Sequence, residues 1–469
     1  MNSTTMAQTG LVDRDLCRRF DVSGPRYTSY PTADRFQADP GAELLVNALR
    51  HRPAPEQPLS LYVHLPFCST VCYYCGCNKV ITKDHSKSSR YLDYLEREID
   101  MQIAALNGSR KVAQLHWGGG TPTFLNDDEM ARLMRILRSR FEFLPEGEYS
   151  IEIDPRSVDP QRAHKLAELG FNRMSLGIQD FDPLVQMAVN RIQSFEQTRD
   201  VLLAAREAGF KSVSVDLIYG LPRQTLEGFC ATLEKTLSLG PDRIALYSYA
   251  HLPKIFMPQR RIHDTELPKP EDKLSLMAMA VEMLVDAGYV FIGMDHFARP
   301  DDELALAQNA GKLHRNFQGY STHAELDLLA FGVSAIAKVG PVYAQNAKSL
   351  DEYYHDIDTG YLPVRRGYRM DADDELRRSV IQELMCHFVL DFDAVSQAWH
   401  IDFQDYFAAA LAELQPLADA GLLQMDSQHI EVMPKGRLLV RIIAMAFDRY
   451  LQADRQRAPE ERQRYSRVI

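Results

Sequence analysis

Short apolar runs alternate with amphipathic segments through the middle of the chain. The runs predict buried strands near residues 59–65, 112–117, 149–153, 173–177, 212–218, 243–248 and 289–293. Between the first two runs, residues 88–106 place Leu92, Leu95, Ile99, Ile103 and Leu106 on one helical face, as in a helix that covers a sheet. This alternation predicts an α/β fold with a parallel sheet and right-handed crossovers, either doubly wound or curled into a barrel.

The two ends of the chain follow a different pattern. Residues 1–50 contain Gly24-Pro-Arg26-Tyr-Thr-Ser-Tyr-Pro31-Thr without a regular period, which predicts an extended N-terminal arm. After about residue 365 the pattern predicts helices at 371–389 and 403–420, a hairpin at 422–433 and a helix at 435–451. We therefore expect an arm (1–50), a partial barrel (51–364) and a mainly helical, winged-helix-like accessory domain (365–469).

Polar residues gather where the predicted strands end. Cys68, Cys72 and Cys75 follow the first strand, Gly118 to Thr121 the second, Glu152 and Asp154 close the third, Gln179 follows the fourth, Asp216 closes the fifth, and Ala250 and His251 follow the sixth. The carboxyl ends of parallel barrel strands form one mouth, where ligand chemistry is assembled. We therefore expect these segments to converge on a single site.

The cysteines just after the first strand have a three-then-two spacing, with Cys77 as a fourth. A 4Fe-4S cluster held by three thiolates keeps one iron open, whereas structural zinc normally takes four protein ligands. The spacing resembles the motif of the radical S-adenosylmethionine (SAM) enzymes, in which the amino and carboxylate groups of SAM chelate the fourth iron. The alternative is a four-cysteine zinc knuckle that uses Cys77, but such a knuckle would not require the other polar strand ends.

Length, charge and cysteine usage exclude several classes of protein. The 469 residues, 45% of them hydrophobic, suffice for a barrel-sized domain and a smaller one. A net charge of -11 argues against broad nucleic-acid binding. No apolar run approaches the roughly 18 residues of a membrane span, and seven cysteines, four of them within ten positions, favour a reducing compartment. We therefore expect a cytoplasmic protein that binds neither nucleic acid nor membrane.

Four strand-end residues suit a ligand such as SAM. Glu152, Gln179 and Asp216 offer acceptors for an ammonium group and a ribose diol, and Arg191 offers a fork for a carboxylate. A single residue of this kind is more often an ordinary cap or strand-end group, but the four together on one rim favour the site. Gly118 to Thr121 does not match the dinucleotide-binding fingerprint, because its glycines are contiguous and the next strand-end acid is Glu152; it better suits a backbone edge for the methionine part of SAM.

Two loops with histidine and arginine follow the seventh predicted strand. His296 and Arg299 lie in one, and His314 and Arg315 in the other. Isolated histidines are more often structural than catalytic. The two arginines could pair with substrate carboxylates or with neighbouring acids such as Asp301.

Together these motifs resemble the oxygen-independent coproporphyrinogen III oxidases, also called coproporphyrinogen dehydrogenases. The resemblance runs from the arm through the cysteine motif, Gly-Gly-Gly-Thr-Pro-Thr, Asp216-Leu-Ile-Tyr-Gly-Leu-Pro222, Gly293 to Pro300 and His314 to Tyr320, to Tyr465-Ser-Arg-Val-Ile469. It implies an incomplete, open TIM-type barrel and the oxidative decarboxylation of two propionates of coproporphyrinogen III to vinyl groups. The product would be protoporphyrinogen IX, the step belonging to heme biosynthesis.

The resemblance also implies particular residues and partners. Within the catalytic motif of Cys68, Cys72, Cys75 and Cys77, the first three would hold the 4Fe-4S cluster. Contacts to SAM, of which the family holds two molecules, would come from Tyr62, Tyr74, Gly119, Gly120, Thr121, Glu152, Gln179, Arg191, Asp216, Ala250 and Ile336. Tyr74 stands where relatives have phenylalanine. The implied partners are a flavodoxin-type electron donor and an unknown acceptor, and the implied state is a monomer.

A second class with the same motif is the heme-binding chaperone that lacks oxidase activity. Those relatives resemble the chain in the three cysteines and the glycine-rich loop, but they end the motif in an aromatic residue where this chain has Cys77. They also usually lack the long arm. The residues therefore favour the oxidase.

The arm from Arg14 to Arg35 has the chemistry of a cover for the barrel mouth. Between Leu11 and Arg35 it holds five arginines and four aspartates, and Tyr27 and Tyr30 could lie on a flat ligand. A primary carbon radical must be kept from solvent, so an open mouth requires a cover. The alternative is an arm that only packs against the protein's own helices.

Overall fold

The computed structural model describes residues 10–323, 325–455, 465 and 467. Residues 1–9 of the predicted arm and most of the last fourteen residues of the predicted C-terminal domain lie outside this description. The chain forms two compact units. We call residues 36–268 and 325–369 the barrel unit, and residues up to 35, 269–324 and 370 onward the accessory unit.

The barrel unit is built on one open sheet. Its strands follow the order β1 (Gln37–Ala38), β17 (Val364–Arg369), β16 (Val342–Asn346), β15 (Ile336–Val339), β14 (Asp327–Phe331), β2 (Leu59–Leu65), β5 (Lys111–Gly119), β6 (Glu142–Ile153), β7 (Arg173–Gln179), β8 (Ser212–Tyr219) and β9 (Arg243–Ser248). Every neighbouring pair from β14 to β9 is parallel, and the pairs from β14 back to β1 are antiparallel. The predicted parallel, open α/β sheet is confirmed.

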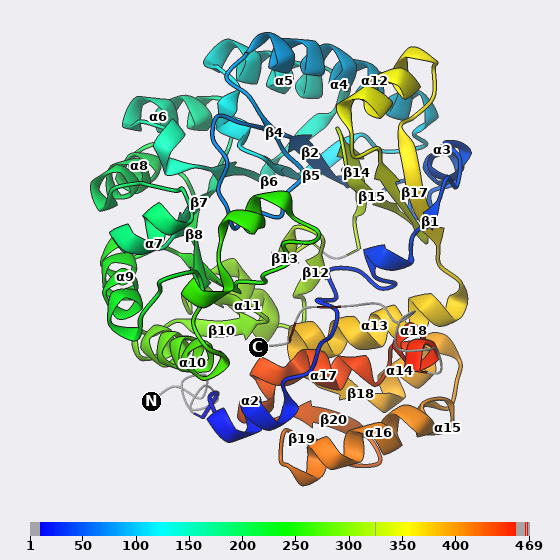
Figure 1. Ribbon diagram of the computed structural model, residues 1–469. Coiled ribbons are helices and arrows are strands. Elements are labelled where there is room, and N and C mark those ends of the chain that lie inside the picture. Colours follow the sequence, from blue (N-terminus) through cyan, green and yellow to red (C-terminus); the bar gives the residue numbers. More distant parts are fainter. Residues whose placement is uncertain (1–9, 324, 456–464, 466, 468–469) are drawn as a thin grey trace. The chain divides into compact units, whose positions relative to one another are not determined.

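Helices cover the outer face of this sheet (Figure 1). They are α3 (Glu43–Arg50), α4 (Ser86–Ala105), α5 (Asp127–Arg140), α6 (Pro160–Glu168), α7 (Pro183–Ala188), α8 (Phe195–Glu207), α9 (Leu226–Leu239) and α12 (Leu350–Asp358), with 3-10 turns η2 (Pro122–Phe124), η3 (Pro155–Ser157), η4 (Met257–Arg261) and η5 (Asp264–Glu266). The apolar face predicted for α4 packs toward the core, since Leu92, Leu95 and Ile99 are fully buried. At the start of α5, Asn126 and Glu129 form a reciprocal capping box.

Glycine permits the sharp ends of several of these helices. Gly170 and Gly209 follow α6 and α8 with φ of 100° and 88°, a left-handed conformation that glycine adopts without a steric penalty. Each lets the chain turn directly into an aromatic residue that is buried before the next strand, Phe171 and Phe210. The chain thus passes from each of these helices to the next strand within a few residues.

The accessory unit is mainly helical. It contains α2 (Arg14–Phe20), η1 (Ala33–Arg35), α10 (Pro270–Asp286), β10 (Val290–Gly293), β11 (His296–Ala298), α11 (Glu303–Asn309), β12 (His314–Asn316), β13 (Gly319–Ser321), α13 (Ala372–His387), β18 (Val389–Asp391), α14 (Phe392–Trp399), α15 (Phe403–Tyr406), α16 (Ala408–Asp419), β19 (Leu423–Met425), β20 (His429–Val432), η6 (Pro434–Leu439), α17 (Val440–Met445) and α18 (Arg449–Arg455). The predicted C-terminal hairpin is present as β19 and β20, with β18 as a third antiparallel strand.

The structure differs from the sequence predictions in several elements. The segment predicted as extended contains two helices, α2 and α3. The predicted helix 403–420 is interrupted at Phe407, and the predicted helix 435–451 is divided into η6, α17 and α18. The last division has a local cause, since the Asp448 carboxylate accepts hydrogen bonds from Tyr450 N and Leu451 N and so begins a new helix. The predicted seventh strand forms an antiparallel hairpin, β10 with β11.

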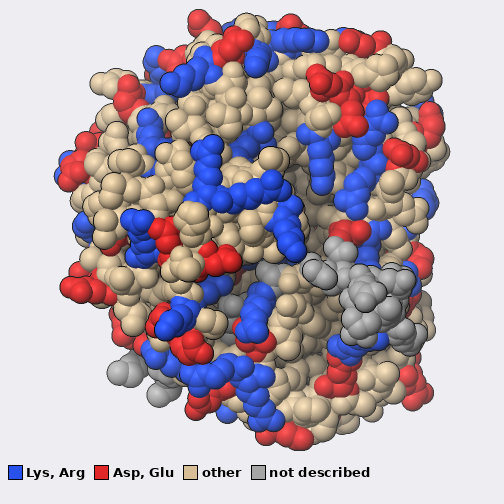
Figure 2. Space-filling model, viewed as in Figure 1, with Lys and Arg blue, Asp and Glu red and all other residues tan. Residues whose placement is uncertain are grey.

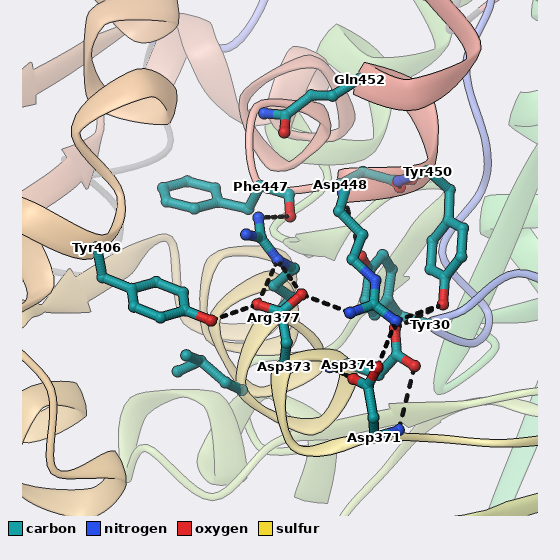
Figure 3. Close-up of polar contacts among 12 residues, drawn as sticks. Tyr30, Asp371, Asp373, Asp374, Arg377, Tyr406, Phe447, Asp448, Tyr450 and Gln452 are labelled. Atoms are coloured by element: carbon teal, nitrogen blue, oxygen red, sulfur yellow. Dashed lines mark hydrogen bonds and ion pairs between the residues drawn. The ribbon is translucent and has the colours of Figure 1, made fainter.

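A polar network holds the arm to the C-terminal helices inside the accessory unit (Figure 3). Asp373 accepts hydrogen bonds from Tyr406 Oη at 2.6 Å and Arg377 Nε at 2.8 Å, and pairs with Arg449 Nη1 at 2.7 Å. Arg449 N donates to the Tyr30 hydroxyl at 3.2 Å. Four segments of the unit therefore meet at one partly exposed group of charges and hydroxyls.

The arm residues proposed to face a flat ligand lie inside the accessory unit. Tyr27 and Tyr30 are buried, and the Tyr27 hydroxyl donates to Asp448 at 2.9 Å. Arg26 pairs with Asp295, and Arg35 with Asp454. Neither tyrosine presents the exposed ring that such a cover would use, so that part of the interpretation is wrong, while the cover itself stays a prediction. No helix among the described residues is long and apolar enough to cross a bilayer.

Candidate cofactor site

The three predicted cluster ligands lie on one loop of the barrel unit, which we call the cluster loop (residues 66–82). Cys68 ends β3 (Phe67–Cys68), which pairs in parallel with β4 (Val80–Ile81). Cys68 and Cys72 are buried, Cys75 is half-buried and Cys77 is exposed. The side chain of Thr121, at the end of the neighbouring strand β5, donates to Cys68 Sγ at 3.4 Å. The first two strand ends therefore meet at the first cysteine, as predicted.

Hydrogen bonds fix the cluster loop from two sides. Tyr73 N donates to Val189 O at 2.9 Å, and Asn190 Nδ2 donates to Val71 O at 2.7 Å, both just after α7. On the other side, Gln259 Nε2 donates to Tyr74 O at 2.9 Å and to Ala250 O at 3.2 Å. Gln259 thus joins two predicted site residues, Tyr74 and Ala250, which are far apart in the sequence.

Two guanidinium groups lie against the second cysteine. Arg156 Nη2 and Arg191 Nη1 are 3.5 Å and 3.7 Å from Cys72 Sγ, and both also pair with Asp154, at 2.7 Å and 3.1 Å. The cations thus offset part of the negative charge that a thiolate-bound cluster brings into this site.

The other sulfurs have contrasting environments. Burial raises the pKa of Cys68 to about 11, against the hydrogen bond from Thr121. The pKa of Cys75 is lowered to about 6, chiefly because the Cys77 thiol donates a hydrogen bond to it, with Lys79 adding positive charge. Among the described residues, no group of three or more His, Cys, Asp or Glu side chains is arranged to hold a single metal ion.

Glu152 closes β6 beside the glycines that end β5. Burial opposes its charge, yet a hydrogen bond from His116 Nε2 at 3.1 Å and one from Gly119 N at 3.2 Å keep its pKa below the usual value. The glycines are required here. A Cβ on Gly118 would lie 2.9 Å from the Glu152 carboxyl carbon, and one on Gly119 would lie 2.7 Å from the His64 ring.

Tyr62 and two histidines make a short polar chain next to Glu152. The Tyr62 ring stacks on His116 with centroids 5.9 Å apart and 12° between the planes. The Tyr62 hydroxyl lies 3.0 Å from His64 Nδ1, and His64 Nε2 lies 3.0 Å from Asn78 O, which belongs to the cluster loop. Tyr62 and Glu152, both predicted to contact SAM, are therefore brought together through His116.

Asp216 faces the same strand ends from β8. The Ser175 hydroxyl lies 3.3 Å from both of its carboxylate oxygens. Burial raises the pKa of Asp216 to about 7, and repulsion from Glu152 adds to this rise. Few protein donors thus compensate this carboxylate, which leaves it available to a donor from a ligand.

Gln179 and Arg191 hold buried polar atoms that the protein does not satisfy. Gln179 adopts φ of 66° where the β7–β8 register shifts, and its Oε1 is buried with no hydrogen-bond partner. Arg191 Nη2 donates to Gly177 O at 2.6 Å, but its Nε is likewise buried and unpartnered. Both atoms lie at the strand ends and are open to a polar partner there.

The remaining predicted residues are placed by the sheet. Gly120 and Thr121 lie on the turn after β5, where Gly120 N donates to Leu65 O and Thr121 N to Phe67 O, both at 2.9 Å. Ile336 begins β15, half-buried, on the antiparallel side of β14. Ile336 thus lies on the other side of β2 from Glu152, Gln179 and Asp216 in the strand order.

Three residues that shape this site were not predicted from the sequence: His116, Arg156 and Gln259. A signal existed for His116, because alternation along β5 and β6 puts it on one face with Ser150 and Glu152, and its Nδ1 is 2.6 Å from Ser150 Oγ. No such signal existed for Arg156 or Gln259, since each reaches the cluster loop from a turn that is distant in sequence.

Comparison with known proteins decides the family. The chain is 50% identical over 459 residues to the oxygen-independent coproporphyrinogen III oxidase of Pseudomonas aeruginosa, an alignment that covers 97% of this chain and 98% of that one. It is 50% identical over 457 residues to the Escherichia coli protein of the same name, with the same coverage. The chain belongs to the oxygen-independent coproporphyrinogen III oxidase family.

Other matches agree with this family. The family model described as "Radical SAM superfamily" matches residues 62–236, and the model described as "HemN C-terminal domain" matches residues 370–439. Among solved structures, the E. coli coproporphyrinogen III oxidase described as a radical SAM enzyme matches with a TM-score of 0.89 and 49% identity, over 93% of this chain and 99% of that one. Membership in this oxidase family implies a 4Fe-4S cluster and SAM.

The residues present fit these two cofactors. Three cysteines on one loop with cations beside them suit an iron–sulfur cluster. Acceptors at Glu152 and Asp216, together with the unpartnered atoms of Gln179 and Arg191, suit a zwitterionic nucleoside ligand such as SAM.

Proposed function

We propose that this chain catalyses the oxygen-independent conversion of coproporphyrinogen III to protoporphyrinogen IX. In this reaction two propionate side chains lose hydrogen and carbon dioxide and become vinyl groups, with one electron passing to an acceptor for each. The observation that carries the proposal is the combination of three loop cysteines with buried, unpartnered polar atoms at the same strand ends. The near full-length identity to oxidases of that name supports it.

Cys68, Cys72 and Cys75 would hold the cluster, and Cys77 would act as a neighbour of Cys75 rather than a ligand. When bound, the cluster and SAM supply a 5'-deoxyadenosyl radical that removes hydrogen from the propionate β-carbon. The chain's own residues bind and orient. The backbone of Gly119, Gly120 and Thr121 offers an edge to the methionine part of SAM.

The side chains of the site would divide the remaining contacts to SAM. Glu152 and Gln179 offer acceptors to the ammonium group, Asp216 to the ribose hydroxyls, and Arg191 a donor to the carboxylate. Tyr62, Tyr74, Ala250 and Ile336 complete the proposed contacts. We also propose that a second SAM molecule binds next to the first, as the resemblance to the family implies.

The wider setting of the reaction is part of the same proposal. The electron donor would be a flavodoxin-type protein, the final acceptor is unknown, and the enzyme would act as a monomer in the cytoplasm. Support for that compartment comes from the cysteines, because the structure leaves all seven of them free and a reducing environment maintains free thiols.

Anaerobic turnover tests the proposal directly. The reconstituted protein would be incubated with coproporphyrinogen III, SAM and dithionite, and porphyrins and 5'-deoxyadenosine would be quantified. The oxidase yields protoporphyrinogen IX with one SAM cleaved per propionate. A protein that binds heme but forms no vinyl product would be a chaperone, and the proposal would fail.

A further inference from the structure

An exposed apolar and basic surface borders the cluster loop. On one side, Ile255 and Met257 are 69% and 67% exposed, and on the other side Met187 and Ile192 are 53% and 67% exposed. Large apolar side chains that gather on a surface mark interaction sites more often than isolated ones do. We call this group, together with Lys254, Arg260 and Arg261, the docking surface.

Both flanks of the docking surface are attached to the cluster loop. Residues 254–261 touch it at three points: Gln259 Nε2 bonds Tyr74 O, Arg261 Nη1 lies 3.3 Å from the Tyr73 hydroxyl, and the Phe256 ring lies close over Gly76. The segment after α7 is held by the bonds from Tyr73 N to Val189 O and from Asn190 to Val71 O described above. The loop between these flanks contains Cys72 and Cys75.

The apolar side chains beneath this surface form one small core. Val185, Val189, Leu221, Tyr249 and Ile262 are buried together, and Tyr73 and Tyr74 of the cluster loop pack against them. The exposed side chains on both flanks are therefore fixed to the same base as the cluster loop, and a partner seated on them would be held at a defined place relative to the cysteines.

The charge of the docking surface is positive in an otherwise acidic chain. Lys254, Arg260 and Arg261 are exposed, and none of the ion pairs within the described residues involves them. Figure 2 shows Lys and Arg side chains gathered over the segment that follows β9, drawn in green in Figure 1. With a net charge of -11 for the whole chain, three exposed cations with no ion pair among the described residues are a local departure.

We propose that the docking surface binds an acidic one-electron carrier protein of the flavodoxin type, which delivers its electron to the cluster held by Cys68, Cys72 and Cys75. This inference rests on the proposed function, since it needs the cluster. Electron transfer weakens steeply with distance, so a donor must reach the protein surface nearest the cluster. Charge complementarity steers an acidic carrier to this surface, and the apolar side chains supply contact area.

The test is a pair of charge-reversal variants. Lys254→Glu with Arg260→Glu alters the docking surface and leaves the contact of Arg261 with Tyr73 intact. The matched control is Arg110→Glu with Lys111→Glu, two exposed cations at the opposite end of β5, which change the net charge equally. Binding of oxidised flavodoxin to each protein would be measured by calorimetry at low and high salt, a readout that does not depend on turnover.

The docking variant should bind flavodoxin about tenfold more weakly than wild type and lose most of the salt dependence. The control should bind like wild type. With dithionite in place of the protein donor, both should form product at the wild-type rate. If the docking variant and the control bound flavodoxin equally well, the proposal would be overturned. It would also be overturned if the only change in the docking variant were a higher KM for coproporphyrinogen III, because that result would assign the surface to the substrate. Failure of wild type with dithionite would instead refute the proposed function, and the binding comparison would still decide the docking surface.

Discussion

Replacing Asp216 with asparagine separates a ligand-binding role from a structural one. In the folded protein Asp216 is half-buried. Among the described residues, the Ser175 hydroxyl is the hydrogen-bond donor to its carboxylate, 3.3 Å from both oxygens, while Glu152 repels the carboxylate and Arg191 and His116 attract it. Its pKa is about 7, against an ordinary 3.8. The ionised Asp216 carboxylate therefore lowers the stability of the folded protein, although it lies where a ligand can reach it.

The size and sign of that cost follow from linkage. Because the folded state holds the proton more tightly, stability from this group is present below the unfolded pKa and is lost as pH rises through the folded pKa. A rise in pKa from 3.8 to about 7 corresponds to about 4 kcal/mol, as an upper estimate. Asp216→Asn removes this ionisation, so the variant should gain stability over wild type progressively from about pH 4 to about pH 8.

Urea unfolding of the apoprotein at several pH values measures this gain in stability. In a separate titration, Asp216→Asn should bind SAM at least about tenfold more weakly than wild type. Asp180→Asn is the control. Asp180 is buried, but it accepts from Thr232 Oγ1 at 2.6 Å, Gln224 Nε2 at 2.7 Å and Asp182 N at 2.8 Å. In Asp180→Asn the new amide would face the Gln224 donor, which should lower the free energy of unfolding by about 1–3 kcal/mol. The affinity of this variant for SAM should be unchanged. If Asp216→Asn were destabilised like the control at pH 8 and bound SAM normally, the reasoning would be refuted.

Two further substitutions test how the site is positioned. His116→Phe keeps the stack on Tyr62 but removes the hydrogen bond to Glu152, so SAM affinity in a binding titration should fall roughly 10- to 100-fold; unchanged affinity would show that Glu152 needs no positioning. Gly120→Ala would place a Cβ 2.5 Å from Pro66 O at the base of the cluster loop, so reconstituted protein should lose most of its iron, with a stability loss of about 1–3 kcal/mol; full iron content by colorimetric assay would contradict this.

The sequence predicted the parallel part of the sheet well. Strand β2 begins and ends at Leu59 and Leu65 as expected, because Leu59, Leu61, Val63 and Leu65 give it one apolar face and a proline stands on either side of the run. The loop expected directly after this strand is likewise present, and it carries Cys68, Cys72 and Cys75. Local pattern was sufficient in both cases.

Other features depend on contacts between distant residues. The strand β14 is a fully buried run of five residues whose parallel pairing with β2 joins Asp327 to Leu59, and nothing local specifies that partner. The same holds for Gln259, whose role comes from its reach to Tyr74 and Ala250. In the arm, the apolar and charged residues of Arg14–Phe20 form only two helical turns, too few for a visible period.

The assignment of Cys68, Cys72 and Cys75 as the cluster ligands can be tested with four single alanine variants, one at each of these residues and one at Cys77, by measuring their iron and sulfide content. Each variant would be reconstituted anaerobically beside wild type. Cys77→Ala should retain a cluster with wild-type iron and sulfide, because the Cys77 thiol donates a hydrogen bond to Cys75 and is not a proposed ligand. Each of the other three variants should lose the cluster. Full loss of iron in Cys77→Ala, together with a retained cluster in any one of the other three, would contradict the assignment of the open iron.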